Sequence, residues 1–121
     1  MLSRSLSLGL LAFSLMSACN FHKDKTSEDT TGTTPTAEQI NFAEVQAKVL
    51  GPYCQNCHSQ GAGNLGGINL EGYAQVKSLI AIIERVTLVE KSMPRGSPLK
   101  GYPAELLTQW IAKGAPETST P

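Results

Sequence analysis

The pentapeptide Cys54-Gln55-Asn56-Cys57-His58 constrains this chain more than any other feature of its sequence. It reads C-x-x-C-H, the pattern through which a c-type haem is attached. Two thiols three positions apart can each add to one vinyl group of the same porphyrin, and the histidine that follows them supplies an axial ligand to the iron. The pattern therefore predicts one covalently bound haem c, held by Cys54 and Cys57 and ligated by His58.

Met93 is predicted to be the second axial ligand of this iron. Met1 and Met16 lie in an N-terminal segment that we expect to be removed, so Met93 is the only methionine of the mature chain. It is followed by Pro94 in a polar loop rich in Gly and Pro, which would hold a thioether over the open face of a haem. The alternative role for Met93, filling a gap in the core, does not suit such polar neighbours.

The N-terminus has the pattern of an export signal. Residues 1–18 carry one charge, at Arg4, and an apolar run from Leu6 to Met16. A run of this length is too short to span a membrane, which takes about 20 residues, but it fits the apolar region of a secretory signal peptide.

The run ends in Leu15-Met16-Ser17-Ala18-Cys19, which resembles the lipobox of bacterial lipoproteins. This resemblance implies cleavage before Cys19, lipidation of that cysteine, and a protein anchored in a bacterial cell envelope facing the periplasm. An ordinary signal peptide followed by a chance cysteine is the alternative.

The cysteine count agrees with these assignments. The chain has three cysteines, so one goes to the lipid and two go to the haem. A C-x-x-C disulfide, or a metal-binding thiol pair in a lipoprotein, is the competing interpretation, because an exported chain enters an oxidising compartment. That interpretation leaves His58 without a role.

Composition divides the rest of the chain into three parts. Residues 19–37 are rich in Thr, Ser and charge, so after the lipidated Cys19 we expect a disordered linker, which includes His22. Residues 38–116 form a single cytochrome-sized domain, and residues 117–121 form a disordered tail. A domain this short buries a marginal core by itself, so a covalent haem would also serve as part of the core.

Three helices are expected in this domain. The first begins at Asn41, where a capping box with Glu44 is possible, and Gly51-Pro52 should end or kink it. The stretch from Gln60 to Gly67 contains four glycines, and we expect it to be a loop. A second helix runs from about Tyr73 to Glu84, and residues 85–92 could continue it or become extended. Its apolar stripe consists of Val76, Leu79, Ile80 and Ile83.

The third helix is expected from about Pro103 to Lys113, with Gly114 as its stop. We expect its buried side to carry Leu106, Leu107, Trp110 and Ile111. Trp110 is interpreted as a packing residue where this helix crosses the first one, with contact to a haem edge as the alternative.

The ordered set of motifs resembles class I cytochromes c, and most closely the small cytochrome c-like domains of bacterial exported proteins. After C-x-x-C-H come Gly66-Gly67-Ile68-Asn69-Leu70, then Met93-Pro94, then Trp110-Ile111-Ala112-Lys113-Gly114-Ala115-Pro116. The resemblance implies an all-α, cytochrome c-like fold with about three main helices around one haem, and iron ligated by His58 and Met93. One feature departs from the family. Class I cytochromes c usually have a proline shortly after the haem histidine, and a nearby backbone carbonyl accepts the hydrogen bond of its Nδ1–H, but no proline lies in residues 59–67. The backbone carbonyl that accepts the hydrogen bond of His58 Nδ1–H is therefore not identified by the sequence.

Ligands on both faces of the iron would leave no open position for a substrate, so we expect an electron-transfer protein rather than an enzyme. The expected function is one-electron transfer at the periplasmic side of a membrane, with membrane or periplasmic oxidoreductases as redox partners. Ten basic and ten acidic residues give no basic excess that would indicate nucleic acid. Lys91, Arg95 and Lys100 cluster around Met93 and could guide an acidic partner, offset a haem propionate, or simply be solvated. A haem protein that binds or senses a small gas through a labile Met93 remains the alternative function.

Overall fold

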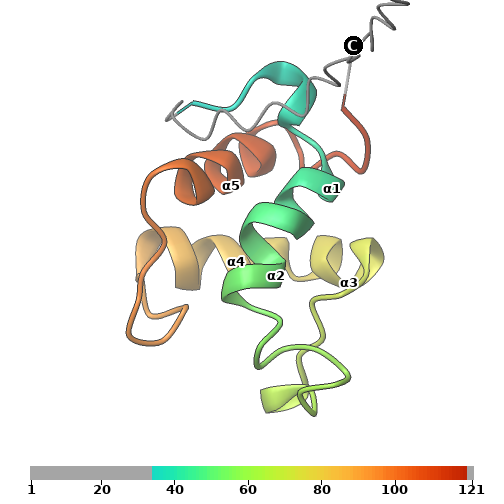
Figure 1. The fold of residues 1–121 in the computed structure, drawn as a ribbon, viewed down its shortest axis with the longest axis vertical. Helices are drawn as coiled ribbons and strands as arrows, with labels where there is room; N and C mark the ends of the chain where they lie inside the picture. Colours follow the sequence, from blue (N-terminus) through green and yellow to red (C-terminus); the bar gives the residue numbers. More distant parts are fainter. Residues whose placement is uncertain (1–33, 120–121) are drawn as a thin grey trace, which may run out of the picture.

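The computed structural model describes residues 34–119. The predicted signal peptide, Cys19, His22 and most of the predicted linker lie outside the described residues. Within residues 34–119 the only regular structure is helical, which confirms the expected all-α class. None of the helices in this part of the chain is long and apolar enough to cross a membrane. Figure 1 shows an N-terminal helical arm, a C-terminal helix packed against its upper part, and a middle helical segment that lies below the C-terminal helix and behind the lower part of the arm.

The N-terminal arm consists of α1 (Phe42–Val45), a π-helical turn η2 (Gln46–Leu50) and α2 (Gly51–Tyr53), which follow one another without a gap. Asn41 caps its start as expected, because Asn41 Oδ1 accepts a hydrogen bond from the Glu44 amide at 2.8 Å. The expected reciprocal bond is replaced: the Glu44 carboxylate accepts a hydrogen bond from the Tyr102 hydroxyl at 3.1 Å. Glu44 therefore ties the first helix to the last one instead of completing a capping box.

Gly51-Pro52 does not end the arm, which continues to Tyr53. The hydrogen-bond pattern widens instead, and the Gly51 amide donates to the carbonyl of Gln46, five residues earlier. Pro52 then falls in the first turn of α2, where its missing N–H costs little. A Cβ atom at position 51 would lie 3.0 Å from that same Gln46 oxygen, so glycine suits the tight turn. The arm therefore ends at Tyr53, directly before Cys54.

The middle segment is α3 (Tyr73–Ser78), α4 (Ile80–Glu84) and the π-helical η4 (Arg85–Val89). The predicted bounds of the second helix are confirmed, but Leu79, with φ −103° and ψ 6°, interrupts it. The stretch whose conformation was left open continues as helical turns to Val89. The interruption divides the middle segment into α3 and α4.

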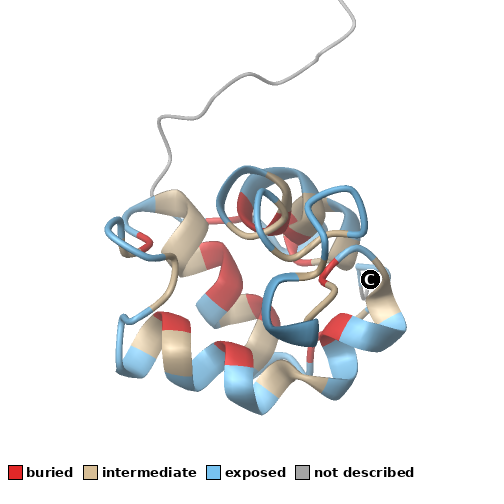
Figure 2. Ribbon diagram, turned by 90° about the horizontal axis from the view of Figure 1, so that it is seen from below, coloured by how far each residue is buried: buried red, intermediate tan, exposed pale blue. Residues whose placement is uncertain are grey.

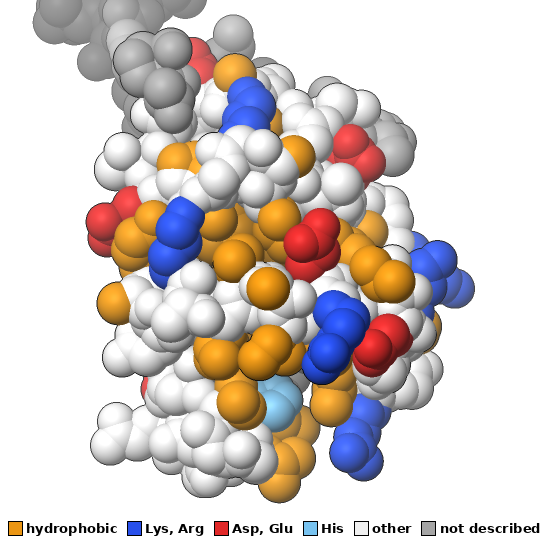
Figure 3. Space-filling view, turned by 180° about the vertical axis from the view of Figure 1, so that it is seen from behind, with side chains coloured by type: hydrophobic (Ala, Val, Ile, Leu, Met, Phe, Trp, Pro, Cys, Tyr) orange, Lys and Arg blue, Asp and Glu red, His pale blue; other side chains and the backbone are white. Residues whose placement is uncertain are grey.

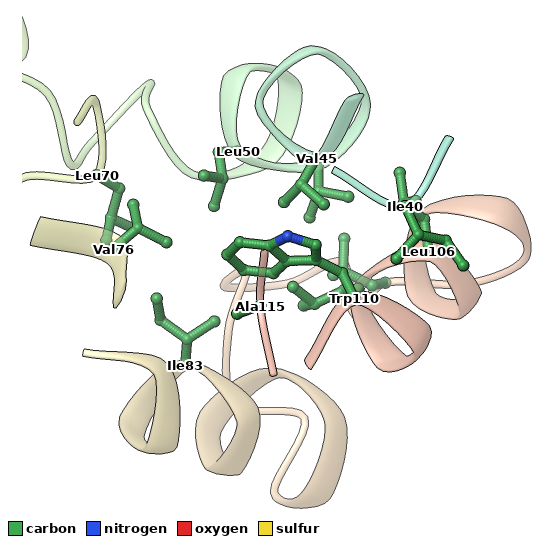
Figure 4. Close-up of a cluster of buried hydrophobic side chains, with 12 residues drawn as sticks. Ile40, Val45, Leu50, Leu70, Val76, Ile83, Leu106, Trp110 and Ala115 are labelled. Atoms are coloured by element: carbon green, nitrogen blue, oxygen red, sulfur yellow. The ribbon is translucent and has the colours of Figure 1, made fainter. Parts of the chain in front are cut away.

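Helix α5 spans Tyr102–Ala112, within one residue of the predicted bounds at each end. Trp110 on α5 is fully buried, and its ring lies 6.2 Å from that of Phe42 on α1. Figure 4 shows Trp110 at the centre of the core, between side chains from the arm and from the middle segment. The core consists of Ile40, Val45, Val49, Leu50, Leu70, Val76, Ile83, Leu99, Leu106, Leu107, Trp110 and Ala115.

Packing extends slightly beyond the expected domain of residues 38–116. Pro35 is already buried and η1 (Ala37–Gln39) precedes the arm. At the other end, the Phe42 amide donates to the Glu117 carbonyl at 3.1 Å. Figure 2 shows the buried residues on the inward sides of the helices, with exposed residues on the outer turns and loops.

Candidate functional site

A cavity of about 310 Å³ lies against the loops that leave α2 and η4. All four residues predicted to bind haem line it: Cys54, Cys57, His58 and Met93. Its remaining walls are almost entirely apolar, and they consist of Tyr53, Leu65, Ile68, Leu70, Leu79, Ile82, Ile83, Val86, Thr87, Pro94 and Arg95. On the face shown in Figure 3, hydrophobic side chains in orange gather around the pale-blue histidine.

The turn that follows α2 brings both thiols and the imidazole to this cavity. The amides of Cys57 and His58 donate to the Cys54 carbonyl at 3.1 and 2.9 Å, and the Cys54 amide donates to Leu50 at 2.9 Å. Cys54 and Cys57 are free cysteines, the former half-buried and the latter exposed. Burial raises the pKa of the Cys54 thiol to about 11, so that thiol stays protonated at neutral pH.

The imidazole of His58 is held by a backbone carbonyl that the sequence did not identify. His58 Nδ1 lies 3.0 Å from the Leu65 carbonyl oxygen. A carbonyl only accepts, so Nδ1 carries the proton, and Nε2 of the neutral ring keeps the lone pair that a metal ligand needs. Leu65 is in turn fixed to the motif, because its amide donates to the Cys57 carbonyl at 2.9 Å. Gly66 and Gly67, with φ of 70° and 74°, let the chain turn back immediately afterwards.

Met93 reaches the cavity from the loop after η4. Its amide donates to the Val86 carbonyl at 3.0 Å, and the Ser92 hydroxyl donates to the same oxygen at 3.3 Å. These bonds fix the start of the loop against the helical turn that also lines the cavity. Met93 is half-buried and outside the core cluster, so the gap-filling alternative is not what its position shows.

The middle segment supplies the largest apolar wall, through Leu79, Ile82, Ile83 and Val86. Thr87 is the only buried polar residue among the residues described, and its hydroxyl donates to the Ile83 carbonyl at 2.6 Å. Sequence periodicity indicated Leu79 and Ile83 but not Ile82, which is 49% exposed and lies on the cavity side. Trp110 is absent from the cavity wall, so its packing role is confirmed and the haem-edge alternative is not.

The three basic residues near Met93 separate in space. All three are exposed, and only Arg95 lines the cavity. Among the described residues the single ion pair joins Arg85 and Glu90 at 3.4 Å, so none of these three cations is neutralised by a carboxylate. Arg95 is therefore the cation placed closest to anything that the cavity holds.

The donor set fits a covalent haem better than a bare metal ion. Within residues 34–119, no three His, Cys, Asp or Glu side chains gather as ligands of one ion. Two thiols, one imidazole with a free Nε2 and one thioether around an apolar cavity match the donor set and the surroundings that a macrocycle with a single iron requires. Comparison of this chain with protein-family models, with curated proteins and with solved structures finds no match.

Proposed function

We propose that this protein is a mono-haem c-type cytochrome with a cytochrome c-like fold, and that it carries single electrons at the periplasmic side of a bacterial membrane. One observation supports the proposal above the others. Four residues chosen from the sequence alone, up to 39 positions apart (93 − 54), line the same cavity. Cys54, Cys57 and His58 are neighbours in sequence, so the informative point is that Met93, 35 positions after His58 (93 − 58), lines the same apolar cavity.

In this proposal each residue has a defined task. Cys54 and Cys57 hold the porphyrin through thioethers, and a bound haem supplies an iron that exchanges one electron. His58 offers Nε2 to the iron because the Leu65 carbonyl keeps the proton on Nδ1. Met93 offers its thioether from a loop tied to Val86, and the apolar walls would contact the faces of the porphyrin.

The competing thiol function receives little support from the site. Disulfide exchange and metal binding both use thiolates, and catalytic thiols have lowered pKa values. Burial instead raises the pKa of the Cys54 thiol to about 11. A half-buried thiol that stays protonated at neutral pH is a poor starting point for disulfide exchange at Cys54.

The cellular setting is part of the same proposal. Cleavage before Cys19 and lipidation of that residue would tether the domain to the membrane through the segment that precedes Thr34. Redox partners would then be membrane or periplasmic oxidoreductases that meet the domain transiently. The exposed apolar residues Tyr53, Leu65 and Ile82 all line the cavity, so its mouth is the surface through which an electron would enter or leave.

The proposal is tested by expressing the full chain in a bacterium that matures c-type cytochromes. A haem stain on a denaturing gel should follow the protein, and intact mass should increase by one haem. A correctly exported domain without haem would contradict the proposal.

Substitution of Met93 tests the sixth ligand. Met93→Leu keeps the apolar volume but removes the sulfur, so the weak near-infrared sulfur-to-iron band of the ferric protein should disappear and the reduced protein should bind carbon monoxide. Leu65→Ala is the matched control, since it changes the cavity wall and leaves both ligands and the accepting carbonyl in place. A wild-type protein that already binds carbon monoxide when reduced would favour the gas-binding alternative.

A further inference from the structure

The segment between His58 and Glu71 is a closed loop whose tip carries the Leu65 carbonyl. At its base, the Leu70 amide donates to the His58 carbonyl at 2.8 Å, and Gln55 Nε2 donates to the Leu70 carbonyl at 2.9 Å. The tip has neither a helix nor a sheet to hold it, because only the short turn η3 (Leu65–Gly67) lies there. Backbone hydrogen bonds from the Leu65 amide to Cys57 and from the Asn64 amide to Ser59, both 2.9 Å, hold the tip, and side-chain hydrogen bonds add to them.

One carboxylate oxygen gathers those hydrogen bonds. Glu71 Oε2 accepts from the Gln60 amide and from Asn69 Nδ2, each at 2.8 Å. These two bonds hold the pKa of the Glu71 carboxyl below its usual value, so the group is ionised at neutral pH. Glu71, near the end of the loop, is thus joined to Gln60, which lies near its beginning, two residues after His58.

The network continues from Glu71 to the tip. Asn69 Nδ2 also donates to Asn64 Oδ1 at 3.0 Å, and Asn69 Oδ1 accepts from the Glu71 amide at 2.9 Å. Asn64 has a positive φ of 48° and directly precedes Leu65. A chain of hydrogen bonds from Glu71 through Asn69 to Asn64 therefore ends one residue before the accepting carbonyl.

We propose that Glu71 is a positioning residue for the iron ligand His58, acting through Asn69 and Asn64 on the Leu65 carbonyl, and that it thereby lowers the reduction potential of the haem. The inference rests on the proposed function. A firmly placed acceptor strengthens the Nδ1–H···O bond and makes the imidazole a stronger donor, which stabilises ferric iron. Loosening the loop weakens that bond and favours ferrous iron.

Two substitutions at position 71 separate hydrogen bonding from charge. Both bonds end on the same oxygen, so the amide oxygen of Glu71→Gln can accept both while the negative charge is lost. Glu71→Ala removes the bonds and the charge together. Glu84→Ala, which removes an exposed carboxylate from α4, is the matched control for loss of charge elsewhere on the domain. Glu71 and Glu84 are both exposed, so all three variants are expected to fold.

The haem-loaded variants are compared in two measurements: reduction potential by mediated titration, and hydrogen exchange of the His58 Nδ1–H by NMR in the ferrous state. Glu71→Ala should raise the potential above that of Glu71→Gln. It should also speed exchange by roughly tenfold, the factor that corresponds to about 1.4 kcal/mol of lost hydrogen bonding. Glu71→Gln should exchange within about twofold of the wild type.

The outcomes distinguish this inference from the function on which it rests. If the wild type carries haem but Glu71→Ala matches Glu84→Ala in both measurements, the positioning role is wrong and the cytochrome proposal stands. If potential rises equally in Glu71→Ala and Glu71→Gln and exchange is unchanged, Glu71 acts through its charge alone and the positioning role is also wrong. If the wild type carries no haem, both are wrong.

Discussion

Replacement of Trp110 by Phe should destabilise the domain strongly without altering the iron of the proposed haem. The Trp110 side chain is fully buried, and its Nε1–H donates to the Pro116 carbonyl at 2.8 Å. Pro116 follows the left-handed turn at Gly114, so this bond folds the end of the chain back onto α5. Phe keeps an aromatic ring against Phe42 but has no donor.

The magnitude follows from two losses. A part-buried carbonyl left without its donor costs about 1–3 kcal/mol. The smaller ring leaves a cavity of about 40 Å³, which at about 24 cal/mol per Å³ adds about 1 kcal/mol. A total of about 3 kcal/mol is a large share of the roughly 4–13 kcal/mol expected for a domain of this length. It should lower the melting temperature by about 12–24 °C.

Circular dichroism and the haem absorbance, followed together through thermal unfolding, would measure this effect. Because Trp110 does not line the cavity, the folded variant should keep the near-infrared band of the wild type. Thr108→Ala is the control, since Thr108 is an exposed residue of the same helix. A melting temperature within about 5 °C of the wild type, which corresponds to about 1 kcal/mol or less, would refute the packing argument. A lost band in the folded variant would show that Trp110 acts on the haem.

Two further predictions concern the hydrogen bond between α5 and α1 and the lipid anchor. Tyr102→Phe should cost about 1 kcal/mol at neutral pH in urea unfolding, because the hydroxyl bond to Glu44 joins α5 to α1. Burial and the Glu44 carboxylate raise the pKa of Tyr102 to about 12, so the wild type should keep this stability below pH 10 and lose it as pH rises from 10 towards 12, while Tyr102→Phe should show a smaller loss over that interval. Cys19→Ser should release a natively folded haem domain from membranes or leave it as uncleaved precursor, because stable anchoring takes about two lipid signals. Processed Cys19→Ser protein that still sediments with membranes after a high-salt wash would contradict lipid anchoring.

The sequence was sufficient for the features that depend on side-chain type and spacing. The stop signals at Gly114 and Pro116 placed the end of α5 within one residue, and the cap at Asn41 placed the start of the arm. C-x-x-C-H and the single methionine after residue 18 were enough to choose four residues that share one cavity. Each of these predictions uses residues with few alternative roles.

Features that depend on the backbone were out of reach. Every residue has a carbonyl, so no pattern could single out Leu65 as the acceptor for His58. The same holds for the π-helical turn that carries the arm past Pro52, because it exchanges one backbone acceptor for another. The interruption at Leu79 was hidden for a different reason: apolar residues at helical spacing continue on both sides of it.

The apolar stripe of the middle segment shows why core and cofactor site could not be separated by sequence. Val76 on α3 is buried in the core cluster, Leu79 lines the cavity, and Ile83 on α4 belongs to both. A single stripe at helical spacing therefore supplies side chains to the core around Trp110 and to the cavity that His58 and Met93 line. Leu70 likewise belongs to both the core cluster and the cavity wall. Because core and cavity share side chains, an apolar cofactor in this cavity would extend the core of a domain that is short for independent stability. We therefore infer that loading of the cavity and folding of the domain are energetically coupled.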